Sequence, residues 1–131
     1  MPTKNTIHDL GVASQIGKYS DAVEAACPGR MLFLSGTPGL MPDGRLPETF
    51  EEQAEEAWKN VFALLARADI GPEHLVKISQ YLVRAEDVPK YPIRAKWIRD
   101  HRPASMLVVV PGLVWPNILI EIEAYAVAPA G

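Results

Sequence analysis

Residues 118–127 read ILIEIEAYAV, and this stretch decides how the rest of the chain is interpreted. Neighbouring side chains of a strand point to opposite faces of a sheet, and apolar and acidic residues alternate here. Glu121 and Glu123 therefore share one face, while Ile120 and Ile122 share the other. The pattern predicts a strand with apolar side chains on one face and two carboxylates on the other.

Two more strands are predicted toward the N-terminus, over residues 21–27 and 31–36. The turn signal Pro28-Gly29 separates them, so we expect an antiparallel hairpin joined by residues 27–30. Residues 37–46 are rich in proline and glycine and have no periodicity, which predicts a loop.

Residues 74–84 and 106–110 complete the expected strands. The first has the period-two alternation of a strand with two different faces. The second is continuously apolar, which predicts a strand covered on both faces. A loop over residues 112–117 carries Trp115 and leads into the last strand.

Residues 49–68 have the spacing of an amphipathic helix. The apolar face is made of Phe50, Ala54, Ala57, Trp58, Val61, Leu65 and Ala68. Thr49 and Glu52 fit a capping box, in which the threonine hydroxyl accepts a hydrogen bond from a backbone amide of the first turn. Gly71 is expected to end the helix as a left-handed cap, just ahead of Pro72.

A second helix is predicted over residues 85–101. It can include Pro92 only in its first turn, because proline has no amide hydrogen, and Pro103 would end it. The resulting order ββαβαββ indicates the α+β class, with one mixed sheet and both helices on one face. The other face would expose apolar residues of several strands, so we expect self-association through a symmetric contact.

Length and composition narrow the class of protein. With 131 residues, 48% of them hydrophobic, we expect one domain over residues 1–131, of which residues 1–16 form an N-terminal extension. A net charge of -3 supplies no basic stripe for nucleic acid. Cys27 is the only cysteine, so no intrachain disulfide can form. The longest strongly apolar stretch, Met106 to Leu113, is too short to span a bilayer, and a cytoplasmic protein with no membrane partner is expected.

Several stretches together resemble the Rid (reactive intermediate deaminase, or YjgF) superfamily. In chain order they are Gly17-Lys18-Tyr19-Ser20, Leu34-Ser35-Gly36, Gln53, Asn60, Pro103-Ala104 and Ile120-Glu121-Ile122-Glu123-Ala124. The resemblance implies a chorismate-mutase-like homotrimer with helices outside and a cleft between each pair of subunits. It also implies hydrolysis of enamines and imines, such as 2-iminobutanoate and 2-iminopropanoate, to a keto acid and ammonia, without cofactor or metal.

The resemblance implies roles for particular residues. Tyr19, Ser35 and Glu121 would be catalytic, and Gly36 would contact the substrate. Where the family has an arginine after Pro-Ala, this chain has Ser105, as in a subgroup that lacks the arginine. Arginine binds a carboxylate through two charge-assisted bonds, whereas serine offers one neutral bond. The change is expected to weaken binding of an α-imino acid by roughly one to two orders of magnitude and to alter the substrate.

Four further residues are candidates for substrate binding. Arg94 and Arg102 could each supply the missing cation, although a surface guanidinium is the favoured interpretation of both. Leu107 is expected to line the cleft. Trp115 could line or close the pocket for an aromatic or lipid-like ligand, or it could cover the rim of the trimer.

Alternatives remain open at this point. Glu121 could be an edge carboxylate paired with a basic neighbour instead of a group that holds water or acts as a general base. The trimer could be a non-catalytic small-molecule-binding or chaperone-like protein, or a ribonuclease, which the acidic charge opposes. His8, His74 and His101 are scattered, so no metal site is predicted.

Overall fold

The computed structural model spans residues 1–131 and describes residues 5–15, 20–25 and 29–130. Five strands form one mixed sheet in the order β3–β7–β5–β6, with β4 also paired to β7. The strands are β1 (Thr6–His8), β2 (Ala22–Glu24), β3 (Gly29–Phe33), β4 (Thr37–Pro38), β5 (Leu75–Leu82), β6 (Ala104–Val109) and β7 (Ile120–Pro129). β7 is antiparallel to β3, β4 and β5, whereas β6 is parallel to β5.

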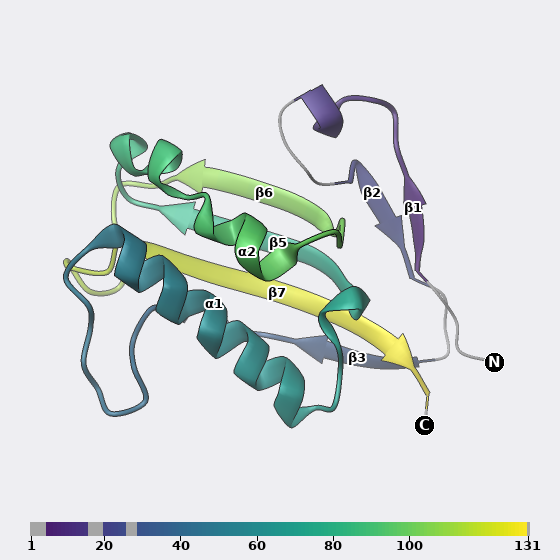
Figure 1. Ribbon diagram of the computed structural model, residues 1–131, viewed down its shortest axis with the longest axis horizontal. Helices are drawn as coiled ribbons and strands as arrows, with labels where there is room; N and C mark the ends of the chain where they lie inside the picture. The colour runs from purple at the N-terminus through teal and green to yellow at the C-terminus, as the bar shows by residue number, and fades with distance from the viewer. Residues whose placement is uncertain (1–4, 16–19, 26–28, 131) are drawn as a thin grey trace.

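Both α-helices, α1 (Phe50–Arg67) and α2 (Ile93–Ile98), lie on one face of this sheet (Figure 1). Short 3-10 helices occupy Ala13–Gln15 (η1), Pro72–His74 (η2) and Ala85–Lys90 (η3). The predicted α+β fold, a mixed sheet with its helices on a single side, is confirmed. No helix in the described part of the chain is long and apolar enough to cross a membrane.

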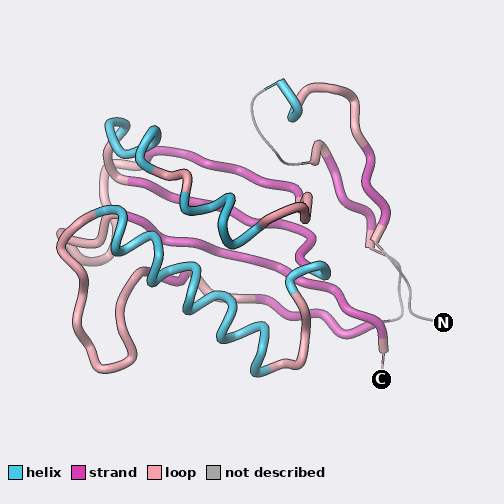
Figure 2. The backbone as a smooth tube through the Cα atoms, in the orientation of Figure 1, coloured by secondary structure: helices cyan, strands magenta, loops and turns pink. Residues whose placement is uncertain are grey.

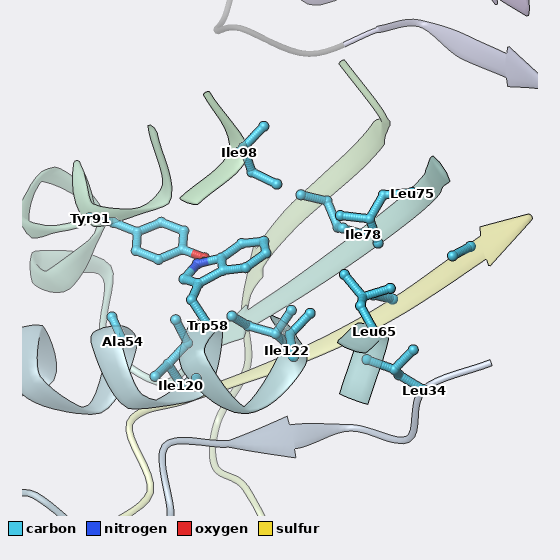
Figure 3. Packing of buried hydrophobic residues seen from close by; sticks show 14 of the residues in the cluster. Leu34, Ala54, Trp58, Leu65, Leu75, Ile78, Tyr91, Ile98, Ile120 and Ile122 are labelled. Carbon is cyan, nitrogen blue, oxygen red and sulfur yellow. The ribbon is translucent and has the colours of Figure 1, made fainter. Parts of the chain in front are cut away.

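The core lies between α1 and the sheet (Figure 3). Trp58 and Leu65 of α1 pack in a cluster with Ile78, Ile120 and Ile122, all almost completely buried. Because Ile120 and Ile122 of β7 face the helices, the alternating Glu121 and Glu123 point to the open face of the sheet. The alternation predicted for this strand is confirmed.

The predicted hairpin between residues 21–27 and 31–36 is wrong. β2 pairs with β1 in a small separate sheet, and β3 pairs with β7 (Figure 2). The β3–β7 pairing places Leu32 and Leu34 against the core, so burial of apolar surface overrides the local turn preference. Residues 27 and 28 of the expected turn, and residue 26 of the expected strand, lie outside the described residues.

The end of α1 also differs from the prediction. Gly71 has φ −79°, and the left-handed residue is Asp69, with φ 56°. The amide of Ile70 donates to the carbonyl of Leu65 (3.0 Å), as in a Schellman motif, in which a left-handed residue follows the helix. Arg30 of β3 donates to the carbonyl of Asp69 (3.2 Å), so a tertiary contact helps to hold a position that glycine usually takes.

The second helix is much shorter than the predicted residues 85–101. Its first part is the 3-10 helix η3, and α2 begins only at Ile93, with Pro92 as its N-cap. Pro89 and Pro92 both lack an amide hydrogen, so a continuous ladder of α-helical hydrogen bonds cannot form across them.

The prediction that residues 106–110 are covered on both faces is wrong for the single chain. β6 is the edge strand of the sheet, and the side chains of Met106, Leu107 and Val109 are exposed. An apolar edge strand of this kind is a ready surface for a second chain.

Replacing Thr49 with alanine is expected to lower the free energy of unfolding by about 1 kcal/mol. The hydroxyl oxygen of Thr49 accepts from the amide of Glu52 (3.1 Å) and the hydroxyl donates to the Glu52 carboxylate (2.9 Å). Urea titration at fixed protein concentration measures the change. T49S keeps the hydroxyl and should match the wild type, and equal stability of T49A would contradict a capping role.

Candidate functional site

Glu121 lies on the open face of the sheet, half-buried, opposite the helices. In register, it faces Tyr81 of β5 on one side and Pro38 of β4 on the other. A Cβ built on Gly36 would come within 2.8 Å of Glu121 Oε1. The carboxylate therefore lies against the backbone of Gly36. Any larger residue at position 36 would displace the Glu121 side chain.

The Ser35-Gly36 segment is thus brought together with Glu121 by the pairing of β4 and β7. Both residues are exposed, and the carbonyl of Ser35 accepts a hydrogen bond from the Thr37 hydroxyl (2.8 Å). Backbone and carboxylate form one small polar spot at the end of β3. Tyr19, the third residue expected there, lies outside the described residues.

Apolar side chains flank this polar spot on the same face. Phe33 is 62% exposed and contacts Tyr125 across β3 and β7, with ring centroids 5.4 Å apart. Met31 is 57% exposed on the same strand, and Met106 is exposed at the opposite edge. The open face therefore has a partly polar centre and apolar edges.

Ser105 points the other way. It is paired in register with Ile78, whose side chain lies in the helix-covered core, and its Oγ accepts from Gln80 Nε2 (3.0 Å). Leu107, next to Gln80 in register, has the same orientation. Within one chain, then, Ser105 and Glu121 lie on opposite faces of the sheet and are separated by β5.

The two candidate arginines have different surroundings. Arg94 Nε donates to Gln80 Oε1 (3.0 Å), which places Arg94 one side chain away from Ser105. Arg102 forms an ion pair with Asp9 near β1 (2.6 Å). Of the two, only Arg94 shares a hydrogen-bond partner with Ser105 among the described contacts.

Trp115 lies, 48% exposed, on the loop between β6 and β7. The base of this loop is fixed by Gln53, a buried residue of α1. Its side chain donates to the carbonyls of Pro47 (2.9 Å) and Asn117 (3.0 Å) and accepts from the amide of Leu119 (2.8 Å). Gln53 thereby joins the loop before α1 to the loop that carries Trp115.

Gln80 is the residue that sequence reasoning missed. It is a fully buried polar side chain on the helix-facing side of β5, between Ile78 and Leu82. That interruption of an apolar face was the available signal, since a buried amide has to be hydrogen-bonded.

A groove of about 440 Å³ lies elsewhere, between α1 and the loop that follows β4. It is lined by Thr37, Pro38, Leu40, Pro42, Asn60, Ala63, Leu64 and Arg67. None of the residues predicted for the site lines it. The candidate site is therefore the open sheet face around Glu121 together with the β6 edge around Ser105.

The mixed sheet is covered by helices on one face only, and Glu121 lies against the Ser35-Gly36 segment. These are features that the resemblance to Rid proteins implies. The family model described as Endoribonuclease L-PSP matches residues 11–128. The chain belongs to this family, the Rid/YjgF family.

Known proteins support the assignment. A RutC family protein of Aquifex aeolicus is 35% identical over 119 residues, which cover 86% of this chain and 90% of that protein. A Rid family protein of unknown function, YyfB from Yersinia pestis, shares the fold with a TM-score of 0.84 at 23% identity, covering 95% and 99% of the two chains. E. coli TdcF, solved with bound serine, has a TM-score of 0.70 and 25% identity, covering 86% and 89%.

Proposed function

We propose that this protein hydrolyses reactive imines and enamines to a carbonyl compound and ammonia, at clefts between the subunits of a homotrimer. The observation that carries the proposal is the position of the Glu121 carboxylate. It lies half-buried against the Gly36 backbone, on the uncovered face of a Rid-family sheet. The proposed reaction uses water and this chain's own side chains.

The chemistry that Glu121 would perform is general base catalysis. The carboxylate takes a proton from a water molecule as the water oxygen attacks the imine carbon. The proton is passed to the nitrogen, which gives a carbinolamine. The hydroxyl proton of the carbinolamine is then moved to its amine, so that the C–N bond breaks to release ammonia as the C=O bond forms. Holding the water next to the imine carbon supplies a further part of the rate increase.

Two halves of the site would come from neighbouring subunits. Glu121 and Gly36 lie on the open face, whereas Ser105 and Leu107 lie at the β6 edge with the opposite orientation. A second copy of the chain placed against the open face could set its β6 edge beside Glu121. The exposed Met31 and Phe33 support such a contact, since burial of apolar surface drives association.

A non-catalytic small-molecule-binding protein is the second candidate. Ser105 stands where the resemblance implies a carboxylate-binding arginine, so the cleft could bind ligands without turning them over. The solved complex of E. coli TdcF with serine shows that one relative takes an amino acid. The endoribonuclease role in the family's description fits less well, because a net charge of -3 and a central carboxylate repel phosphate.

The proposal is tested by producing 2-iminopropanoate and 2-iminobutanoate in situ with an amino acid oxidase and following keto-acid release. The protein should accelerate hydrolysis at least 100-fold over buffer, in line with general base catalysis. Rates equal to those in buffer, for these and for bulkier imines, would refute the enzymatic function. Calorimetry with pyruvate and 2-oxobutanoate would then decide whether the cleft binds ligands. An RNA-cleavage assay tests for ribonuclease activity.

A further inference from the structure

A network of polar side chains joins Ser105 to α2 through a single buried glutamine. Gln80 has no exposed surface, and its amide makes four hydrogen bonds. Oε1 accepts from the hydroxyl of Tyr91 (3.2 Å) and from Arg94 Nε (3.0 Å). Nε2 donates to Ser105 Oγ (3.0 Å) and to the carbonyl of Met106 (2.8 Å). Since a primary amide has two donor hydrogens and two acceptor lone pairs, these bonds use its full capacity and fix its orientation.

The fixed amide determines what Ser105 offers to a ligand. A serine hydroxyl carries one hydrogen and can accept through oxygen. Because Ser105 Oγ already accepts from Gln80, the hydroxyl hydrogen is directed away from Gln80. Ser105 is half-buried and lies on β6, the edge strand of the main sheet. The bond from Gln80 thereby leaves the hydroxyl hydrogen of Ser105 to donate to another acceptor, such as a ligand.

Arg94 brings a permanent positive charge to the same amide. Its guanidinium remains protonated at every physiological pH, and its Nε is fixed by Gln80. Trp58 also stabilises the network, because its Nε1 donates to the hydroxyl of Tyr91 (2.9 Å). Burial raises the pKa of Tyr91 well above its usual value, so the hydroxyl stays protonated and keeps its bond to Gln80.

A guanidinium and a hydroxyl donor, held on the two ends of one amide, are the groups that bind a carboxylate. We propose that Arg94 and Ser105, aligned by Gln80 as a positioning residue, bind the carboxylate of an α-imino acid. Together they would replace the single arginine that the family resemblance places at position 105. The inference rests on the proposed function and assigns to Arg94 and Ser105 a preference for anionic α-imino acids over neutral imines.

The test is the variant R94Q, which removes the charge but keeps a side-chain amide. We expect its KM for 2-iminopropanoate to rise roughly ten- to hundredfold, the effect of losing a charge-assisted bond, with little change in kcat. Hydrolysis of the imine of propanal, which has no carboxylate, should not change. K96Q is the matched control, because Lys96 lies on the same helix and pairs with Glu55 instead of Gln80.

The outcomes separate this inference from the proposed function. If the wild type hydrolyses 2-iminopropanoate and R94Q has the same KM, or if R102Q shows the KM increase instead, the inference is wrong and the proposed function stands. If the wild type hydrolyses no imine but binds pyruvate in calorimetry, and R94Q binds it at least tenfold more weakly, the carboxylate site stands and the enzymatic function fails. For a wild type that hydrolyses no imine, pyruvate binding that R94Q leaves unchanged, or no pyruvate binding at all, overturns the inference.

Discussion

Replacing Glu121 with glutamine is expected to reduce kcat/KM for imine hydrolysis by about 10²- to 10⁴-fold, the contribution of a positioned general base. Glutamine has nearly the same shape, so it should fit against Gly36 and still hold a water molecule. It cannot take the proton from that water. The variant should therefore fold and assemble normally while hydrolysis approaches the rate in buffer, as measured by keto-acid release.

The matched control for this experiment is E123Q. Glu123 lies on the same strand and the same face, two residues from Glu121, and is paired in register with Ser79. Its loss of charge should leave kcat/KM within about twofold of the wild type. Full activity of E121Q, or an equal loss in E123Q, would show that the carboxylate of Glu121 has no specific role in proton transfer.

Replacing Phe33 with aspartate is expected to dissociate the oligomer and to abolish activity with it. Among the described residues, Phe33 is the most exposed aromatic side chain on the open face, so an interface over this face would bury it. A carboxylate buried there without a partner costs several kcal/mol, which shifts the assembly equilibrium by orders of magnitude. Light scattering gives the mass, and the imine assay gives the activity of the same sample.

L64D controls for the introduced charge. Leu64 is also an exposed apolar residue, but it lies on α1, on the other side of the sheet. The L64D variant should therefore keep the oligomeric state and the activity of the wild type. A wild-type protein that is monomeric at micromolar concentration, or an F33D monomer with full activity, would refute a site shared between subunits.

The sequence predicted best where a pattern and its burial agree. The alternation around Glu121 correctly placed Ile120 and Ile122 in the core, because a strand has only two faces and the helices cover one of them. The start of α1 was equally predictable, since the Thr49 hydroxyl caps the amide of Glu52, only three residues away. Both signals depend on residues close together in the chain, so they can be identified from the sequence.

Predictions failed where distant residues decide the outcome. The turn signal at Pro28-Gly29 favoured a local hairpin, but β3 pairs with a strand from the far end of the chain. Asp69, not Gly71, takes the left-handed position, where Arg30 contacts the backbone from another strand. Local preference is weaker than tertiary contacts, and the sequence alone does not show which contacts form.

The candidate site was predictable only in part. The Ser-Gly segment and Glu121 do meet, but Ser105 lies on the other face, and no pattern indicated that Gln80 would connect it to Arg94. Hydrogen-bond networks depend on the exact placement of side chains from several elements. A hydrophobic pattern can show that a buried polar side chain needs hydrogen-bond partners, but not which residues supply them.

The central position of β7 affects how the sheet forms during translation. This strand follows β3, β4 and β5 along the chain, yet it is hydrogen-bonded to all three. While a ribosome is still translating the earlier segments, β3 and β4 have no partner strand, and α1 has only part of the surface it will cover. Nascent chains should therefore expose apolar strand edges until the centre of the sheet emerges, and chaperones that bind such edges would act during that interval.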